Sequence, residues 1–436
     1  MKKLLVGTTA LLSMLSLLAH AKDLSVMYGE TFADAIEPGI AQYEKDTGNT
    51  VIRQKIPAAT IYDQKLSLDF IGGQAADLML VDSYTLSSHV EAGYLRDISP
   101  FVSSWPEWQS VYDNFKNSVT FDNKIYALPL DTDVRMMYYN IDTFKEHGIE
   151  VPWQPKNWDE LIATAEKLKA EGVEQSLLIP VGVSRGEETT MQGFYMLLLG
   201  ADVPTDDRNR LRDWNDGKWI VDSPALRKTL GFYKDVYMDK KLSPYSAYTQ
   251  SYNLAARVKG YFDGSVGIWF DGSWRYVEMF FNTGVEPTDE LIAKIAYARV
   301  PGSGCEGCLD YTNISGGWTL AMNEKVSDIE EAAKLMEYIY GKEYFTNWIN
   351  ASGKISTRGD AAESEAYMSN AFVSGLTDMV KGTTLRDTYP GYLIVTQAVQ
   401  QMTQDIVDGK SVDEALARYK ESLDFEFGAD NLKTYE

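Results

Sequence analysis

The hydrophobic and polar residues near the start of the chain predict strands and helices in turn. Short apolar or alternating segments predict strands, and longer segments with apolar residues every three or four positions predict helices. In one such helix Tyr62, Leu66 and Phe70 share a face. Strands are expected at Asp23–Gly29, Thr50–Ile56 and Ala76–Asp82, and helices at Asp34–Gly48 and Ile61–Ile71. This β-α-β-α-β order is typical of a mostly parallel sheet covered by helices.

A second α/β region begins near Tyr126. Here and later in the chain, strands are expected at Lys124–Leu130, Val134–Asn140, Ser176–Val183, Val266–Phe270, Ile292–Val300 and Gly317–Met322. The expected helices are Asn157–Gly172, Met191–Gly200, Ser327–Gly341, Leu393–Asp408 and Ser411–Asp424. Two of them begin with the pattern of a capping box, Ser327 with Glu330 and Ser411 with Glu414. No Pro- or Ser-rich linker separates the regions, so we expect domains joined by strand-like crossings.

Composition narrows the possible partners. The 436 residues suffice for a large core, and 63 acidic against 41 basic residues give a net charge of -22. Nucleic acid is therefore not an expected partner, because phosphate binding needs a surplus of Lys and Arg. The same charge argues against an anionic membrane surface.

The first 21 residues have the features of a secretory signal peptide. Lys2 and Lys3 precede a short apolar segment that ends at the small-residue site Ala19-His20-Ala21. An anchor helix is the alternative, but the apolar segment is too short to favour it. We expect cleavage after Ala21 and a soluble periplasmic protein. Removal of two lysines and no acid changes the charge to 39 − 63 = -24.

Several motifs suggest chemistry that their surroundings do not support. The G-x-S-x-G at Gly182–Gly186 would need a histidine after Ser184, but His89 and His147 both precede it. Cys305 and Cys308 form a C-x-x-C in a Gly-rich loop, without the helix start of a redox site or further ligands for zinc. A disulfide is expected there in an oxidising compartment. We expect no cofactor, no metal and no enzymatic activity.

What remains is a set of acids and aromatic residues at the ends of predicted strands. Carboxylates accept charge-assisted hydrogen bonds from hydroxyl groups, and aromatic rings cover the apolar faces of sugars. The candidates are Tyr28, Glu30, Asp82, Asp131, Asp133, Asp271, Trp274, Trp318, Tyr389 and Tyr392. The alternatives are core packing for any single aromatic residue and helix capping for a strand-end Asp.

Five segments, in order, resemble the bacterial extracellular solute-binding proteins of ABC importers, in the carbohydrate-binding group that includes maltose-binding protein. The segments are Ala75–Leu95, which contains the sequence EAGYL, Tyr126–Asn140 with YALPL and YYN, Asp271–Trp274, Ser315–Trp318, and the tail with Tyr389, Tyr392 and Ser411–Leu416. The Cys305–Cys308 loop is not part of the usual pattern of that family.

The resemblance implies an α/β, two-lobed type II periplasmic binding protein fold, each lobe being a mostly parallel sheet flanked by helices, with a hinge between the lobes. The implied lobes are residues 22–131 plus 316–350 and residues 132–315 plus 351–436. By position it implies ligand contacts for Asp82, Asp133, Trp274, Trp318 and Tyr389, and extends to Tyr28, Glu30, Asp271 and Tyr392.

The implied function is capture of a carbohydrate in the cleft between the lobes and its delivery to a membrane permease, by a monomer. Two other classes stay open. A secreted glycosidase or lyase is one, because 63 acids offer many carboxylate pairs. A binder of a cationic solute such as a polyamine is the other, because aromatic boxes bind cations.

Overall fold

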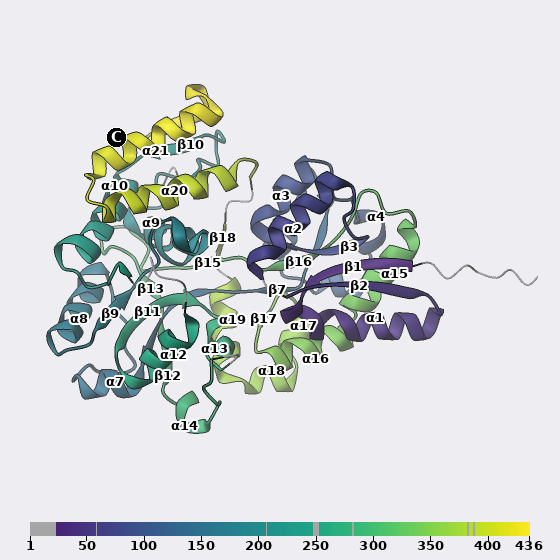
Figure 1. The fold of residues 1–436 in the computed structure, drawn as a ribbon, viewed down its shortest axis with the longest axis horizontal. Coiled ribbons are helices and arrows are strands. Elements are labelled where there is room, and N and C mark those ends of the chain that lie inside the picture. Colours follow the sequence, from purple (N-terminus) through teal and green to yellow (C-terminus); the bar gives the residue numbers. More distant parts are fainter. Residues whose placement is uncertain are drawn as a thin grey trace, which may run out of the picture.

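The computed structural model describes residues 23–57, 59–205, 207–246, 253–280, 283–381, 383–386 and 389–436. The expected signal peptide lies outside these residues. The chain forms two lobes that lie side by side, each built around one main sheet (Figure 1). Within the described residues, no helix is long and apolar enough to cross a bilayer.

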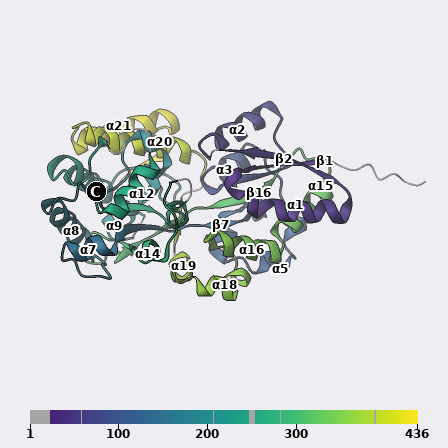
Figure 2. The same ribbon diagram turned by 60° about the horizontal axis from the view of Figure 1, so that its bottom comes forward.

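The first lobe contains a five-stranded sheet in the order β2-β1-β3-β16-β6. Its strands are β1 (Asp23–Gly29), β2 (Thr50–Ile56), β3 (Leu78–Asp82), β6 (Ala127–Pro129) and β16 (Trp318–Met322). Strand β1 is parallel to β2 and β3, whereas β16 is antiparallel to β3 and β6. Helices α1 (Ala33–Thr47) and α2 (Ala59–Gly72) lie on opposite faces of this sheet (Figure 2).

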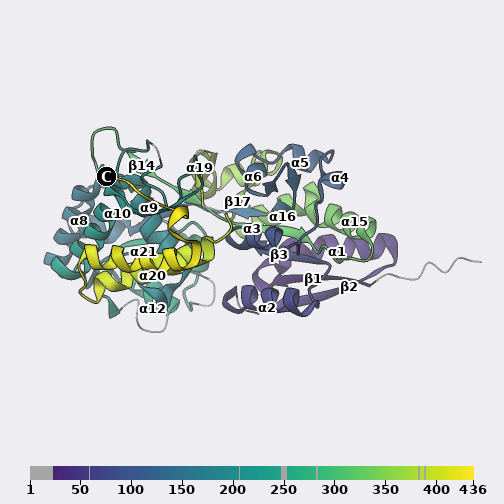
Figure 3. The same cartoon turned by 90° about the horizontal axis from the view of Figure 1, so that it is seen from above.

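The second lobe contains a four-stranded sheet in the order β12-β8-β11-β9. Its strands are β8 (Arg135–Asn140), β9 (Gln175–Leu178), β11 (Val266–Gly272) and β12 (Ile295–Ala298). Its helices include α8 (Trp158–Ala170), α9 (Tyr195–Ala201), α10 (Pro224–Lys234), α12 (Leu254–Asp263), α20 (Tyr392–Val407) and α21 (Val412–Phe427). The last two lie together along one side of this lobe (Figure 3).

Both main sheets are mixed, so the expectation of a mostly parallel sheet in each lobe is wrong. In the second-lobe sheet, β8 is antiparallel to both β11 and β12, so only the β9–β11 pair is parallel. In the first-lobe sheet, two of the four strand pairs are antiparallel. The right-handed crossover rule constrains strands that a local helix connects. Strands β8 and β16 instead enter their sheets directly after a crossing from the other lobe, so that rule does not fix their direction.

The crossings between the lobes form two short ladders. Strand β7 (Asp131–Thr132) pairs antiparallel with β17 (Ile355–Ser356), and β15 (Ile314–Ser315) pairs parallel with β18 (Thr384–Leu385). The crossings touch at Gly317, whose φ of 139° suits glycine and where a Cβ would overlap the carbonyl of Asp131. The expected strand-like crossings are therefore present.

The other elements are shorter or connect these layers. The helices are η1 (Glu30–Phe32), α3 (Ser83–Glu91), α4 (Ser99–Val102), α5 (Pro106–Gln109), α6 (Asp113–Ser118), α7 (Ile141–Glu146), η2 (Val183–Arg185), the π-helices η3 (Thr189–Phe194) and η4 (Asp235–Asp239), α13 (Arg275–Glu278), α14 (Asp289–Ile292), α15 (Ile329–Tyr340), α16 (Lys342–Ser352), α17 (Gly359–Ala362), α18 (Glu365–Ser369), α19 (Ala371–Lys381) and η5 (Ala429–Asn431). The strands are β4 (Thr120–Phe121), β5 (Lys124–Ile125), β10 (Trp219–Asp222), β13 (Val300–Pro301), β14 (Tyr311–Thr312) and β19 (Leu432–Thr434).

Helix starts test the capping predictions. Ser411 and Glu414 form the expected capping box at α21. The box expected at Ser327 and Glu330 is wrong: α15 is capped by Asp328, whose carboxylate accepts from the backbone N–H of Glu331. Asp is as good an N-cap as Ser, so a helix start one residue later is equally well capped.

Segments after α16 remain in contact with the first lobe. The N–H of Tyr112 donates to the carbonyl of Thr357 at 3.0 Å. The buried Arg358 donates from Nη1 to the carbonyl of Tyr340, at the end of α15, at 2.6 Å. Residues around β17 and α17 are thus held by first-lobe elements.

Candidate functional site

Charged side chains from both lobes meet where the crossings join the two sheets. Asp82 ends β3 and also caps α3, accepting from the N–H of Tyr84 at 3.4 Å. Asp133 follows β7, accepts from the N–H of Gly316 at 2.9 Å and pairs with Arg135 at the start of β8. We call the boundary cluster the group Asp82, Asp133, Arg135, Glu187, Arg386 and Asp63, whose carboxylate accepts from the hydroxyl of Tyr84.

Arg386, directly after β18, connects the carboxylates of the two lobes. Its guanidinium lies 3.5 Å from Asp82 of the first lobe and 3.5 Å from Glu187 of the second. Burial raises the pKa of Asp82 to about 7, although Arg386 opposes this effect. Burial opposes the charge on Arg386, but Asp82 and Glu187 outweigh it, so the pKa of Arg386 is raised. Arg386 therefore stays charged while Asp82 titrates near neutral pH.

The second lobe contributes a fixed carboxylate from the segment after η2. Glu187 accepts from the hydroxyls of Tyr392 and Thr396, each at 2.6 Å, which orients it toward Arg386. Its neighbour Glu188 pairs with Arg185, and burial raises the pKa of Glu188.

Trp274 lies at the boundary with its indole packed against the backbone. A Cβ on Gly272 would overlap the ring of Trp274, so only glycine allows this contact. The guanidinium of Arg135 lies 5.1 Å from the ring centroid, and the side chain is half-buried. Asp271 is buried and pairs with Arg275 at 2.8 Å, so it acts within the second lobe.

Trp318 lies at the start of β16, opposite Asp82 in the register of the first sheet. Its ring packs on Phe32 and Tyr62, with centroids at 5.4 and 5.3 Å, and the side chain is half-buried. The backbone N–H of Trp318 donates to the buried Asp131 at 2.8 Å, and Asp131 also pairs with Lys354. Trp318 thus borders the cluster from the first lobe.

The structure does not bring all predicted residues together. Tyr28 is fully buried in the first lobe, and its hydroxyl donates to Glu37 at 2.9 Å. Glu30 is exposed in η1. Tyr389 is 37% exposed and stacks on Arg212 of the second lobe at 3.6 Å. Tyr392 is buried but reaches the cluster through its hydroxyl.

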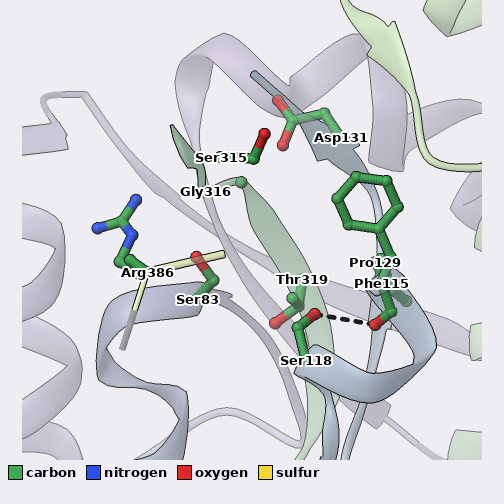
Figure 4. A pocket seen from close by; sticks show the side chains of 10 residues that line it. Ser83, Phe115, Ser118, Pro129, Asp131, Ser315, Gly316, Thr319 and Arg386 are labelled. Atoms are coloured by element: carbon green, nitrogen blue, oxygen red, sulfur yellow. Dashed lines mark hydrogen bonds between the residues drawn. The ribbon is translucent and has the colours of Figure 1, made fainter. Parts of the chain in front are cut away.

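A small pocket opens beside the boundary cluster (Figure 4). Its empty volume is about 320 Å³, including the part open to solvent. It is lined by Ser83, Phe115, Ser118, Pro129, Asp131, Ser315, Gly316, Gly317, Thr319 and Arg386. Residues of the first-lobe sheet, of the helices beside it and of the crossings thus face one space.

Sequence reasoning missed Arg386, Glu187, Asp63 and Arg135. Glu187 and Glu188 directly follow the Gly182–Gly186 loop, where a pair of acids after a strand could have indicated a site. Arg386 has no local signal, because its role depends on pairing between β15 and β18, far apart in sequence.

The one cysteine pair is in its oxidised form. Cys305 and Cys308 form the expected disulfide. Among the described residues, Asp202 and these two cysteines are the group whose atoms lie close enough to hold a metal ion. Because both sulfurs are bonded to each other, they offer no thiolate ligands.

Comparisons with known proteins agree with this architecture. The family model described as "Bacterial extracellular solute-binding protein" matches residues 29–344. A binding protein of Brucella abortus (strain 2308) is 24% identical over 355 residues, covering 81% of this chain and 80% of that protein.

Two solved structures share the fold over almost the whole chain. A solute-binding protein of an ABC transporter from Thermotoga lettingae TMO, bound with alpha-D-tagatose, has a TM-score of 0.74 at 22% identity, covering 93% of this chain and 99% of that one. The maltose-bound MalE3 of T. maritima has a TM-score of 0.74 at 20% identity, covering 93% and 100%. The expected two-lobed binding-protein fold is confirmed.

Proposed function

Because the chain belongs to the family of bacterial extracellular solute-binding proteins, we propose that it captures a carbohydrate between its lobes and delivers it to the permease of an ABC importer. The ligand is a sugar, an oligosaccharide or a polyol. The observation that carries the proposal is the boundary cluster, where carboxylates of both lobes lie beside the half-buried Trp274. The similar structures that hold alpha-D-tagatose and maltose support it.

The site residues have distinct roles in this proposal. Asp82 and Asp133 accept hydrogen bonds from ligand hydroxyls, as ionised carboxylates do well. Trp274 and Trp318 offer ring surface from the second and the first lobe. Asp271 and Tyr392 orient Arg275 and Glu187, which supports the site from behind. Tyr28 and Tyr389 are left out, because their contacts lie elsewhere.

A cationic ligand fits the rings less well than a neutral one. Three aromatic rings near the boundary already have a cation of the chain itself beside them. Arg135 lies over Trp274 at 5.1 Å, Arg386 over Tyr84 at 5.1 Å, and Lys354 over Phe32 at 4.2 Å. A polyamine would bring further positive charge beside these cations, whereas a neutral sugar would not, so the carbohydrate proposal is preferred.

The lobes move as two bodies about the crossings in this proposal. The first lobe comprises residues 22–131 and 316–350, together with the segment near 355–362 that Tyr112 and Tyr340 hold. The second comprises 132–315 and the rest of the tail. Ligand in the cleft favours the closed arrangement to the extent that it binds that arrangement better.

The proposed location rests on the signal-peptide pattern of residues 1–21. We propose cleavage after Ala21 and a monomer in the periplasm. The mature protein purified from osmotic-shock fluid would then begin at Lys22, as intact mass can test. A mass that includes residues 1–21 would contradict the proposal.

Calorimetry against a carbohydrate panel tests the proposed function. Maltose, D-tagatose and D-mannitol are titrated into the mature protein, and the ligand is recovered and analysed afterwards. The proposal expects saturable binding of at least one probe, recovered unchanged. Turnover of a probe would instead support a glycosidase or lyase, and binding of spermidine without any carbohydrate would support the polyamine alternative.

A further inference from the structure

Arg386 occupies the junction of the two lobes. It follows β18, which pairs with β15 of the second crossing, and only 6% of its surface is exposed. Arg386 lines the pocket with Ser83, Ser315 and Asp131, and lies at its edge in Figure 4. A Cβ on Gly316 would overlap the guanidinium, so the glycine at this crossing leaves the space that Arg386 occupies.

The contacts of Arg386 leave hydrogen-bonding capacity free. Its distances to Asp82 and Glu187 are both 3.5 Å, long for charge-assisted hydrogen bonds. Among the described residues, its buried Nε has no hydrogen-bond partner. The same holds for the Nε of Arg135 and the Oδ1 of Asp63. Unmet buried polar atoms are costly, so three in one cluster indicate a place where a polar ligand completes the network.

The charges of the cluster indicate which ligand suits it. Four carboxylates, Asp63, Asp82, Asp133 and Glu187, surround the guanidinium groups of Arg135 and Arg386. Both arginines are therefore already compensated. A ligand carboxylate would bring a further negative charge beside these acids, which costs free energy in a buried site.

We propose that Arg386 is a ligand-binding residue that donates from Nε to a neutral polyhydroxyl ligand and holds Asp82 and Glu187, one from each lobe, as acceptors for the same ligand. The proposal rests on the proposed function. It makes one side chain responsible both for contact with the ligand and for joining the lobes around it.

Matched arginine variants test this role. Arg386→Gln removes the charge and the Nε donor, and Arg386→Lys keeps the charge but loses the planar fork. Arg227→Gln is the control, because Arg227 pairs with Asp222 and Asp413 at 2.6 Å on the surface of the second lobe. Thermal melts and circular dichroism establish that each variant folds, and Arg386→Lys is measured if Arg386→Gln does not.

Calorimetry with maltose, D-tagatose and D-mannitol gives the main result. We expect Arg386→Gln to weaken the bound probe about tenfold to hundredfold, as loss of a charged hydrogen bond does, and Arg227→Gln to stay within about twofold. The aldonic acids maltobionate and mannonate should bind the wild type at least about tenfold more weakly than their neutral counterparts.

Binding affinity measured over a pH series distinguishes an effect of Arg386→Gln on ligand contact through Asp82 from a purely structural effect of that substitution. Asp82 faces Asp63 of α2, Tyr84 of α3, Asp133, Arg135 and Arg386. Because Asp82 accepts best when ionised, affinity should rise with pH through neutrality. Without Arg386, the proton on Asp82 is held more tightly, so this rise should move to higher pH in Arg386→Gln.

The possible results distinguish failure of the proposed function from failure of the role proposed for Arg386. A wild type that binds none of the probes overturns the proposed function and the inference with it. A wild type that binds, with Arg386→Gln within threefold and its pH profile unmoved, overturns the inference alone. Equal binding of maltobionate and maltose would contradict the assignment of a neutral ligand.

Discussion

Replacement of Trp274 by Ala separates a ligand platform from a core residue. The indole is half-buried, packs against Gly272, and has the guanidinium of Arg135 5.1 Å from its ring centroid. An aromatic side chain presents about 150–250 Å², of which one ring face is about half. At roughly 25 cal/mol per Å², covering that face contributes about 2–3 kcal/mol to binding. Trp274→Ala should therefore weaken carbohydrate binding about thirtyfold or more.

The thermal stability of Trp274→Ala is the second quantity to measure. Trp158 is the control, because it is 5% exposed, packs on Phe232 at 4.9 Å and donates from Nε1 to Pro301 at 3.1 Å. Removal of such a core residue costs about 3–5 kcal/mol, whereas Trp274→Ala should leave the melting temperature of the unliganded protein nearly unchanged. Calorimetry and thermal melts measure both quantities. If Trp274→Ala melts as early as Trp158→Ala while its folded fraction binds normally, the indole is structural and the reasoning is refuted.

Three further predictions concern single groups. Burial raises the pKa of Asp82 from 3.8 to about 7, so the folded protein holds this proton longer than the unfolded chain. Ionisation of Asp82 should therefore lower the free energy of unfolding by at most about 4 kcal/mol as pH rises from about 4 to 7. Urea titrations should show this loss in the wild type relative to Asp82→Asn. The same pH dependence of stability in both proteins would contradict it. Gly316→Ala should displace Arg386 and weaken binding about tenfold, and unchanged affinity would argue against that contact. Cys308→Ser should keep affinity within about threefold, because the disulfide closes a loop of only four residues; a hundredfold loss would place this loop in the site.

Local patterns predicted the elements well and their assembly less well. The bounds of β1 and β2 match, because Gly29 ends the first strand and Pro57 directly follows the second. Asn157, the first residue of the predicted range, is the N-cap of α8, since its side chain accepts from the backbone N–H of Glu160. The antiparallel direction of β8 was not predictable, because side-chain alternation is the same in both directions.

The candidate site was predicted in part. Strand ends correctly brought Asp82, Asp133 and Trp274 to the lobe boundary, because both sheets end there. Tyr28 lies at a strand end too, but β1 is buried on both faces, so its ring belongs to the core. Arg386 depends on a pairing across 70 residues of sequence between Ser315 and Leu385, which no local spacing encodes.

A structure of the mature protein with its best-bound carbohydrate would show whether the ligand lies at the boundary cluster. We expect one intact ligand between the lobes, with hydroxyls on Asp82 and Asp133, the Nε of Arg386 within hydrogen-bond distance, and a ring face on Trp274. A ligand bound outside the boundary cluster, or a cleaved product within it, would rule out the proposed carbohydrate site.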